Sequence, residues 1–290
     1  AGAWSSGGNM NNGRYTLAAA SQGSSTAGFI FGGETWAGSS STLNVVESYD
    51  GSSWTETTEI NTARRQHAGF GTQTSAVCAG GGPNPGTANV ESWNGSAWTE
   101  TTEINTTQAY RSGAGASNTS GIIFGGGPPG LDNVETWDGS SWTEVSELNT
   151  AGYGRMPAGI QTAALAAGGG TGPAPAGVLN VEKWDGSSWT EVSELNATEF
   201  FGGSGGSNTM ALVYGGAGPV NRTEEYDGSS WTEVGDLGTA RYGGTGQGTA
   251  GSSTTGNMYA GGDGYPTNPA GMTNTEEWAY SHAFKKVTTG

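Results

Sequence analysis

The chain has 290 residues, of which 26 are acidic and only 10 are lysine or arginine, so its formal net charge at pH 7 is -16. This charge argues against a nucleic-acid-binding protein, which carries a basic stripe, and it favours solubility and repulsion from anionic membranes. No run approaches the roughly 18 apolar residues of a membrane-spanning helix. We therefore expect neither membrane insertion nor a nucleic-acid partner.

An eleven-residue block recurs along the chain. It first appears as Val46 to Glu56 and returns at 90–100, 134–144, 181–191 and, slightly altered, 223–233. The aligned tryptophans are separated by 44, 44, 47 and 42 residues; they are Trp54, Trp98, Trp142, Trp189 and Trp231. A period of this length, with a glycine pair and a tryptophan in each unit, is typical of a β-propeller.

Each repeat predicts four strands. The first is rich in glycine and alanine, as in residues 68–71, and the second is a buried apolar run that ends on a glycine pair, as in residues 121–124. An Asp-Gly or Asn-Gly turn joins the third strand, Val-Glu-x-Trp or Val-Glu-x-Tyr, to the fourth, Ser-Trp-Thr-Glu. We expect the large aromatic residues to pack between neighbouring blades and the lone Cys78 to be a buried, inert thiol.

The two ends of the chain indicate the number of blades. A short apolar run that ends on a glycine pair occurs six times, whereas the tryptophan block is complete only five times. Its sixth copy is split, with Thr275–Trp278 supplying the first half and Ala3–Ser5 the second. We predict an all-β, six-bladed propeller over residues 1–280, with four antiparallel strands per blade and a last blade closed by pairing of residues 2–6 with residues 273–280. Residues 281–290 are expected to be a C-terminal tail or linker.

The order of these motifs resembles the kelch repeat, over nearly the whole chain. More narrowly, the repeated Trp-Asp-Gly-Ser-Ser-Trp-Thr-Glu units and the ending Val287-Thr288-Thr289 resemble kelch-like proteins of marine bacteriophages. This resemblance implies a kelch-type fold and a non-enzymatic virion module of the tail, tail fibre or particle surface, contributing to structure or host attachment. Its implied partners are other virion proteins or a host surface glycan or lipopolysaccharide, with a homo-oligomer as a further option.

Two other functions stay open, a bacterial surface or secreted lectin-like kelch protein, which would be extracellular, and a carbohydrate-active enzyme. Galactose oxidases of the kelch type bind copper through two histidines and two tyrosines, but the only histidines here are His67 and His282. The Asp-Gly turn also lacks the residue that the sialidase Asp-box has between Asp and Gly. We therefore expect no enzyme, no metal and no cofactor. The glutamates that recur once per blade, Glu47, Glu91, Glu135 and Glu182, are interpreted as exposed rim residues.

The variable segments predict the binding face. The loops after the glycine pairs and the connections between blades diverge from repeat to repeat, and both lie opposite the Asp-Gly turns. A guanidinium suits carboxylate, phosphate or sulfate, and an aromatic face suits a sugar ring. The candidate ligand-binding residues in the connections are Arg14, Tyr15, Arg64, Arg65, His67, Tyr110, Arg111, Tyr153, Arg155, Phe200, Phe201, Arg241 and Tyr242.

We hypothesise that these residues recognise an acidic surface glycan or lipopolysaccharide around the mouth of the central channel. The alternative is that the arginines pair with nearby strand carboxylates and that the aromatic residues cap the blades.

Overall fold

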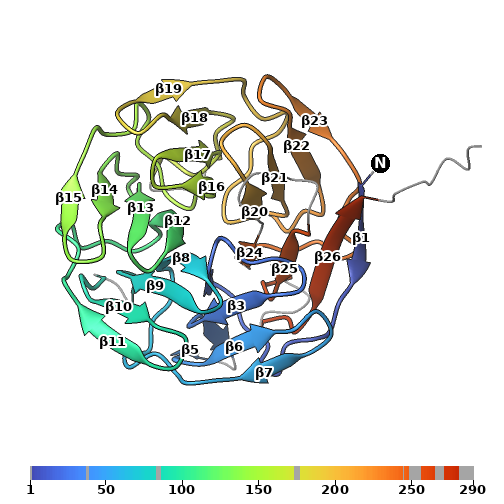
Figure 1. The fold of residues 1–290 in the computed structure, drawn as a ribbon. Helices are drawn as coiled ribbons and strands as arrows, with labels where there is room; N and C mark the ends of the chain where they lie inside the picture. Colours follow the sequence, from blue (N-terminus) through green and yellow to red (C-terminus); the bar gives the residue numbers. More distant parts are fainter. Residues whose placement is uncertain are drawn as a thin grey trace, which may run out of the picture.

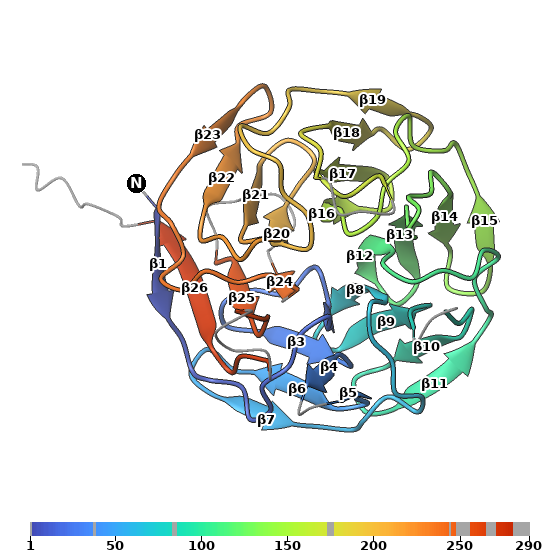
Figure 2. The same ribbon diagram turned by 180° about the vertical axis from the view of Figure 1, so that it is seen from behind.

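The protein folds as a disc of six blades around a central channel (Figures 1 and 2). The computed structural model describes residues 2–36, 39–82, 86–172, 177–243, 245–247, 256–264 and 271–280. The expected tail at residues 281–290 lies outside this part of the chain. In the described residues we find no helix long and apolar enough to cross a membrane.

Every blade is a four-stranded antiparallel sheet that runs from the channel to the rim, which confirms the predicted architecture. Blade 1 contains β2 (Ala18–Ala19), β3 (Gly28–Phe31), β6 (Val46–Tyr49) and β7 (Trp54–Glu56), and blade 2 contains β8 (Ala68–Thr72), β9 (Ser75–Ala79), β10 (Val90–Trp93) and β11 (Trp98–Thr101). Blade 3 contains β12 (Ser112–Ser117), β13 (Ser120–Phe124), β14 (Val134–Trp137) and β15 (Trp142–Glu144), and blade 4 contains β16 (Met156–Ile160), β17 (Ala163–Ala167), β18 (Val181–Trp184) and β19 (Trp189–Glu191). Blade 5 contains β20 (Gly203–Gly206), β21 (Ala211–Tyr214), β22 (Thr223–Tyr226) and β23 (Trp231–Glu233), and blade 6 contains β24 (Thr245–Gln247), β25 (Met258–Ala260), β26 (Thr275–Tyr280) and β1 (Gly2–Ser6).

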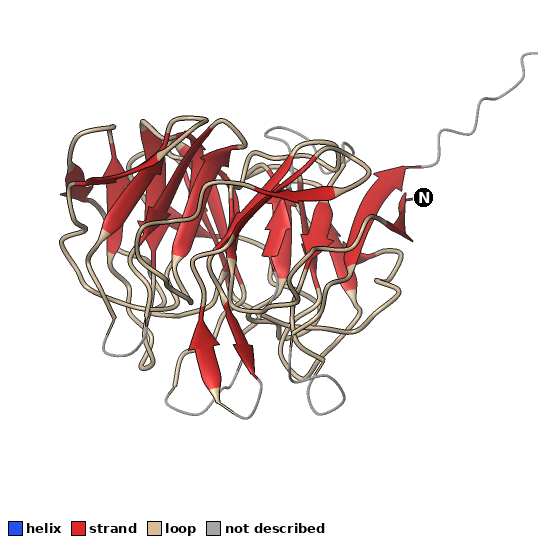
Figure 3. Ribbon diagram, turned by 90° about the horizontal axis from the view of Figure 1, so that it is seen from below, coloured by secondary structure: helices blue, strands red, loops and turns tan. Residues whose placement is uncertain are grey.

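A separate hairpin, β4 (Glu34–Trp36) paired with β5 (Ser40–Thr42), belongs to the loop after the glycine pair of blade 1. Seen from the side, it projects beyond one face of the disc (Figure 3). Trp36 on this hairpin is 44% exposed.

The hydrophobic core is divided among the interfaces between blades. Six clusters of buried residues join each blade to the next one around the ring. Between blades 1 and 2, for example, Phe29 stacks on Trp93 with ring centroids 5.3 Å apart, and Phe31 meets Trp98 edge-on at 5.1 Å. The predicted packing of aromatic residues between blades is confirmed, and Cys78 is buried in this same cluster.

Local chemistry explains the turns and the innermost strands. In the turn of blade 1, Gly51 has a φ of +95° and the carboxylate of Asp50 accepts hydrogen bonds from the backbone N–H groups of Ser52 and Ser53, each 2.8 Å long. Along the channel, a Cβ atom added to Gly69 would lie 2.6 Å from the carbonyl oxygen of Ala19. Glycine therefore permits the close approach of neighbouring inner strands.

The N-terminal strand β1 closes the ring as expected. It pairs with β26 from Gly2 opposite Tyr280 to Ser6 opposite Glu276. The indole of Trp4 packs edge-on against Tyr214 in blade 5, with centroids 4.7 Å apart, and donates a 2.9 Å hydrogen bond to Thr223. The strand therefore covers the edge of blade 6 and also ties that blade to blade 5.

Deletion of residues 1–6 is expected to lower the free energy of unfolding by roughly 4 kcal/mol or more, because it exposes a sheet edge and removes a buried interface. Urea unfolding followed by tryptophan fluorescence measures this loss. Ser5→Ala on the same strand is the control, since the Ser5 side chain is exposed. Equal stability of the deletion variant and the control would show that the closing strand contributes little.

Candidate functional site: the mouth of the central channel

Five of the seven arginines lie inside the protein rather than on the predicted binding face. Arg14, Arg64, Arg111, Arg155 and Arg241 are at most 4% exposed. Each pairs with a glutamate in the third strand of the blade that follows its connection. The pairs are Arg14–Glu47, Arg64–Glu91 at 2.5 Å, Arg111–Glu135 at 2.5 Å, Arg155–Glu182 at 3.6 Å and Arg241–Glu276 at 2.6 Å.

The interpretation of the repeated glutamates as exposed rim residues is wrong. Glu47, Glu91, Glu135 and Glu182 have no exposed surface. The connection from the preceding blade crosses the third strand and covers the face on which the glutamate lies. Glu91, for example, accepts a 2.7 Å bond from the backbone N–H of Asn61 and a 3.1 Å bond from that of Thr62, in addition to its contact with Arg64.

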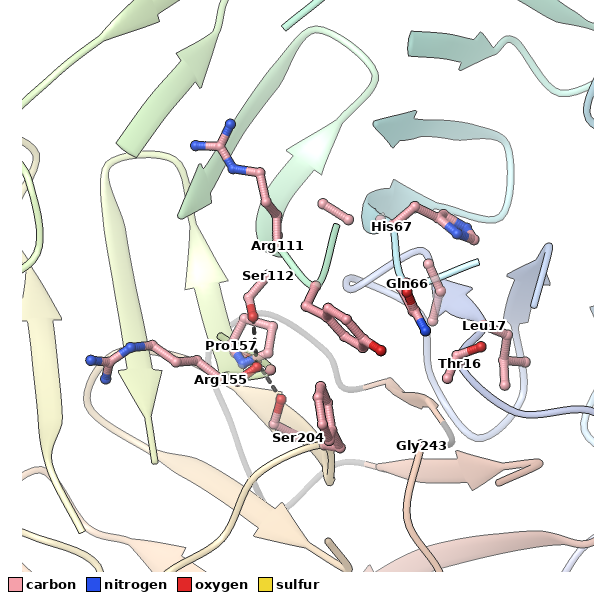
Figure 4. Close-up of a pocket in the computed structure, with 18 of the residues that line it drawn as sticks. Thr16, Leu17, Gln66, His67, Arg111, Ser112, Arg155, Pro157, Ser204 and Gly243 are labelled. Atoms are coloured by element: carbon pink, nitrogen blue, oxygen red, sulfur yellow. Dashed lines mark hydrogen bonds between the residues drawn. The ribbon is translucent and has the colours of Figure 1, made fainter. Parts of the chain in front are cut away.

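These buried pairs tie each connection to its blade, which is the alternative role that the sequence left open for the arginines. Burial lowers the pKa of Arg111 from its usual value, and the charge of Glu135 opposes this shift. The close-up of the channel shows the guanidinium groups of Arg111 and Arg155 directed away from its centre (Figure 4). A ligand in the channel would therefore not meet them.

Six residues form a closed hydrogen-bonded ring around the channel, which we call the mouth ring. Each lies twelve residues after the tryptophan that precedes it, and each has a φ between +52° and +64°; they are Thr16, Gln66, Tyr110, Gly154, Phe201 and Gly243. The backbone N–H of each member donates to the carbonyl of the equivalent residue in the previous blade. These bonds are 2.7 to 3.1 Å long from Gln66 round to Gly243, and the bond from Thr16 to Gly243 completes the ring.

Four of the six mouth-ring residues carry side chains in a backbone region that favours glycine. Such a conformation costs on the order of 1 kcal/mol per residue and tends to occur where a structure holds side chains for a function. Here it places the side chains of Thr16, Gln66, Tyr110 and Phe201 along the lining of one cavity.

The cavity extends from the mouth ring into the channel and has a volume of about 130 Å³. Below the ring it is lined by the first residues of the inner strands, which have small side chains such as Ala18, Ala68, Ser112 and Ser204. His67 also lines it and is buried, and burial lowers the pKa of His67 to about 3, so that its imidazole is neutral at pH 7.

Aromatic residues gather on one side of the mouth. The rings of Tyr110, Tyr153 and Phe201 contact one another with centroids 5.1 to 6.0 Å apart, and Phe200 adjoins Phe201 at 5.2 Å. Tyr153 is buried, whereas Tyr110, Phe200 and Phe201 are partly exposed. The structure thus brings four of the predicted aromatic residues into one cluster.

The opposite side of the mouth is polar. Backbone bridges join Tyr15 to Glu34 and Tyr242 to Asp263, so that the connections and the loops after the glycine pairs lie on the same face. Burial raises the pKa of Tyr15 to about 12, and the charges of Glu34 and Asp263 add to this shift. Arg65 forms an ion pair with Glu34 and is partly exposed.

Sequence reasoning missed Thr16 and Gln66 as mouth residues, whereas it placed the loops that begin at Glu34 and Asp263 on the predicted binding face. The signal for the first two was available, because they occupy the same position in the repeat as Tyr110 and Phe201. Among the described residues, no group of three or more His, Cys, Asp or Glu side chains is placed to hold a metal ion.

The fold is shared with solved structures. The structure of YjhT matches this chain with a TM-score of 0.74 at 12% sequence identity, over 95% of this chain and 97% of that one. At this identity the likeness shows the propeller fold alone. No protein-family model and no curated protein matches the sequence. The function must therefore be argued from the mouth itself.

Proposed function

We propose that the protein is a non-enzymatic binding module that holds a carbohydrate at the mouth of its channel. The observation that carries this proposal is the cluster of Tyr110, Tyr153, Phe200 and Phe201, of which Tyr110 and Phe201 line the cavity. Sugar rings present apolar C–H faces that pack on aromatic rings, while their hydroxyl groups need hydrogen-bonding partners nearby. The aromatic cluster provides the packing surface, and the hydroxyl and amide side chains that line the cavity provide the hydrogen-bonding partners.

The same geometry favours a neutral glycan over the acidic one expected from the arginines. All seven arginines pair with a carboxylate, and the two that are partly exposed, Arg65 and Arg222, bind Glu34 and Glu199. An anionic sugar would have to compete with these carboxylates and approach a chain with a net charge of -16. A neutral sugar neither competes with these carboxylates nor is repelled by the net charge.

The biological setting that we propose is attachment of a bacteriophage particle to its host, with the protein at the virion surface or tail. The support for it is the kelch-like order of motifs and the repeat style of the sequence. A secreted or surface lectin of a bacterium would use the same mouth in the same way.

The proposal predicts that Tyr110→Ala weakens glycan binding at least ~10-fold, since it removes a ring from the middle of the aromatic cluster. Binding is measured on an array of neutral and acidic bacterial surface oligosaccharides, followed by calorimetry on the strongest neutral ligand. Trp36→Ala is the matched control, because Trp36 is exposed on the same face but lies on the projecting hairpin. Loss of binding only in Trp36→Ala would place the site outside the mouth.

A further inference from the structure

Ser21, in the turn after β2 of blade 1, lines the cavity at the mouth. The inner strands start at the mouth ring and end near the opposite face, and there Gln22 crosses the channel. Its side-chain amide donates a 2.9 Å bond to the carbonyl of Gly159 in blade 4, and its backbone N–H donates a 2.8 Å bond to Gly71 in blade 2. Gln22 therefore joins three blades across the channel, directly after Ser21, which lines the cavity.

Gln22 occupies this place because blade 1 differs from its neighbours. Its inner strand β2 has only two residues, and the chain then turns through Ala20 and Gly23 before β3 begins. In blades 2 and 4 the shorter turn after the inner strand carries an amide side chain, Gln73 or Gln161, that bonds to a carbonyl of the preceding blade. The crossing of the channel by Gln22 is thus a specific feature of one blade rather than a consequence of the repeat.

The size of the cavity limits what can enter it. A volume of about 130 Å³ lies below the roughly 300–1,000 Å³ of pockets that take a whole small-molecule ligand. This space accepts part of a single sugar unit, and Gln22, which crosses the channel, stands in the path of a chain that would continue along it.

The lining offers hydrogen-bonding groups suited to sugar hydroxyls. The amide of Gln66 and the hydroxyl of Tyr110 make no side-chain hydrogen bond to other described residues. The hydroxyls of Ser112 and Ser204 donate to backbone carbonyls of blade 4 at 2.7 and 2.6 Å, which leaves their oxygens as acceptors (Figure 4). His67 is neutral, and the guanidinium groups of Arg111 and Arg155 point away from the cavity (Figure 4). The cavity therefore offers sugar hydroxyls hydrogen-bonding groups that carry no charge.

We propose that the mouth binds a neutral glycan by its terminal sugar, which enters the cavity while the next unit packs on the aromatic cluster. This inference rests on the proposed function and adds the mode of recognition. A side-on mode, in which an internal segment of the chain lies across the mouth, would leave the cavity unused.

The test uses neutral linear oligosaccharides tethered through their reducing ends, in a series of two to eight units of the sugar selected on the array. Each is offered intact and with its non-reducing terminal unit capped by a different sugar. Terminal recognition gives an affinity that changes less than about 3-fold with chain length and falls at least ~10-fold on capping. Gln66→Asn, which tolerates the left-handed backbone but shortens the side chain, should weaken binding of the intact series and leave the melting temperature unchanged.

Two results would overturn the inference. An affinity that rises steadily with chain length and survives capping would establish side-on binding, while the proposed carbohydrate function would stand. Failure of the folded wild-type protein to bind any oligosaccharide on the array would reject both the proposed function and the terminal mode.

Discussion

Arg64→Met is expected to lower the free energy of unfolding by about 3 kcal/mol or more, because it leaves the carboxylate of Glu91 buried without its counter-charge. Neither side chain of this pair has exposed surface. The guanidinium also donates a 2.7 Å bond to the backbone carbonyl of Asn89, so the substitution removes a link between the connection and the third strand as well. Urea unfolding of the wild type and the variant at pH 7 measures the difference.

Two further variants separate the charge from the loss of packing. Arg64→Met combined with Glu91→Gln keeps an acceptor for the backbone of Asn61 but removes the unpaired charge, so it should be more stable than Arg64→Met alone. Lys183→Met is the control for loss of a cation, since Lys183 forms no ion pair with described residues, and it should change stability by less than about 0.5 kcal/mol. If Arg64→Met lowered the free energy of unfolding as little as the control does, the buried pair would not stabilise the blade.

The fold could be predicted because it follows from local chemistry that repeats. Asp-Gly turns, glycine pairs and the tryptophan spacing each fix a feature within one unit, and the split copy at Trp4 and Trp278 then fixes how the units close. The aromatic part of the site was predicted for a similar reason. Tyr110, Tyr153 and Phe201 lie in equivalent connections, and equivalent positions of a propeller converge on its axis.

The electrostatics could not be predicted in the same way. The alternation of side chains along a strand places Val90 and Glu91 on opposite faces of the blade. The sequence does not show that the connection from the preceding blade covers the face that carries Glu91. Arg64 and Glu91 are 27 residues apart, so their pairing depends on how the connection crosses the blade. The crossing of the channel by Gln22 was hidden for the same reason, since the bond between Gln22 and Gly159 spans 137 residues.

Blade 5 breaks the pattern of buried pairs, and this has a consequence for pH dependence. Glu199 stands ten residues after Trp189, where blades 1, 2 and 6 have their arginine. Among the described residues, Glu224, the buried glutamate of this blade, therefore accepts hydrogen bonds only from Asn196 and Ala197. Arg222 instead pairs with Glu199 at 2.5 Å, and it lies 3.8 Å from the exposed Glu233.

Two buried carboxylates, Glu199 and Glu224, thus lie near each other, and the partly exposed guanidinium of Arg222 pairs with Glu199. Burial raises the pKa of Glu199 to about 7, with Arg222 opposing the shift and Glu224 adding to it. Because this pKa lies above the usual value of 4.5, the folded state holds the proton more tightly than the unfolded state does. The resulting contribution to stability is complete below about pH 4.5 and is lost as the pH rises through about 7.

Glu199→Gln should remove this pH dependence, because the amide resembles the protonated carboxyl group. We expect wild type and variant to unfold at similar urea concentrations at pH 5, and the variant to be more stable at pH 8. Glu59→Gln, which changes an exposed glutamate, is the control for the change in net charge. A difference between wild type and Glu199→Gln that is the same at both pH values would contradict the argument.

The repeat itself supplies a stronger version of this experiment. Glu199→Arg restores the residue found at the equivalent position of blades 1, 2 and 6, and Arg222→Asn restores the residue found in blades 2, 3, 4 and 6. The double variant should form the missing pair with Glu224 and exceed the wild type by about 1 kcal/mol or more at pH 8, with a smaller gain at pH 5 where Glu199 of the wild type is protonated. Because Phe200 and Phe201 follow directly, glycan binding by this variant also shows whether the charge arrangement of blade 5 serves the mouth. Unchanged affinity would mean that Glu199 affects stability alone, whereas altered affinity at an unchanged fold would couple the proton on Glu199 to the aromatic cluster.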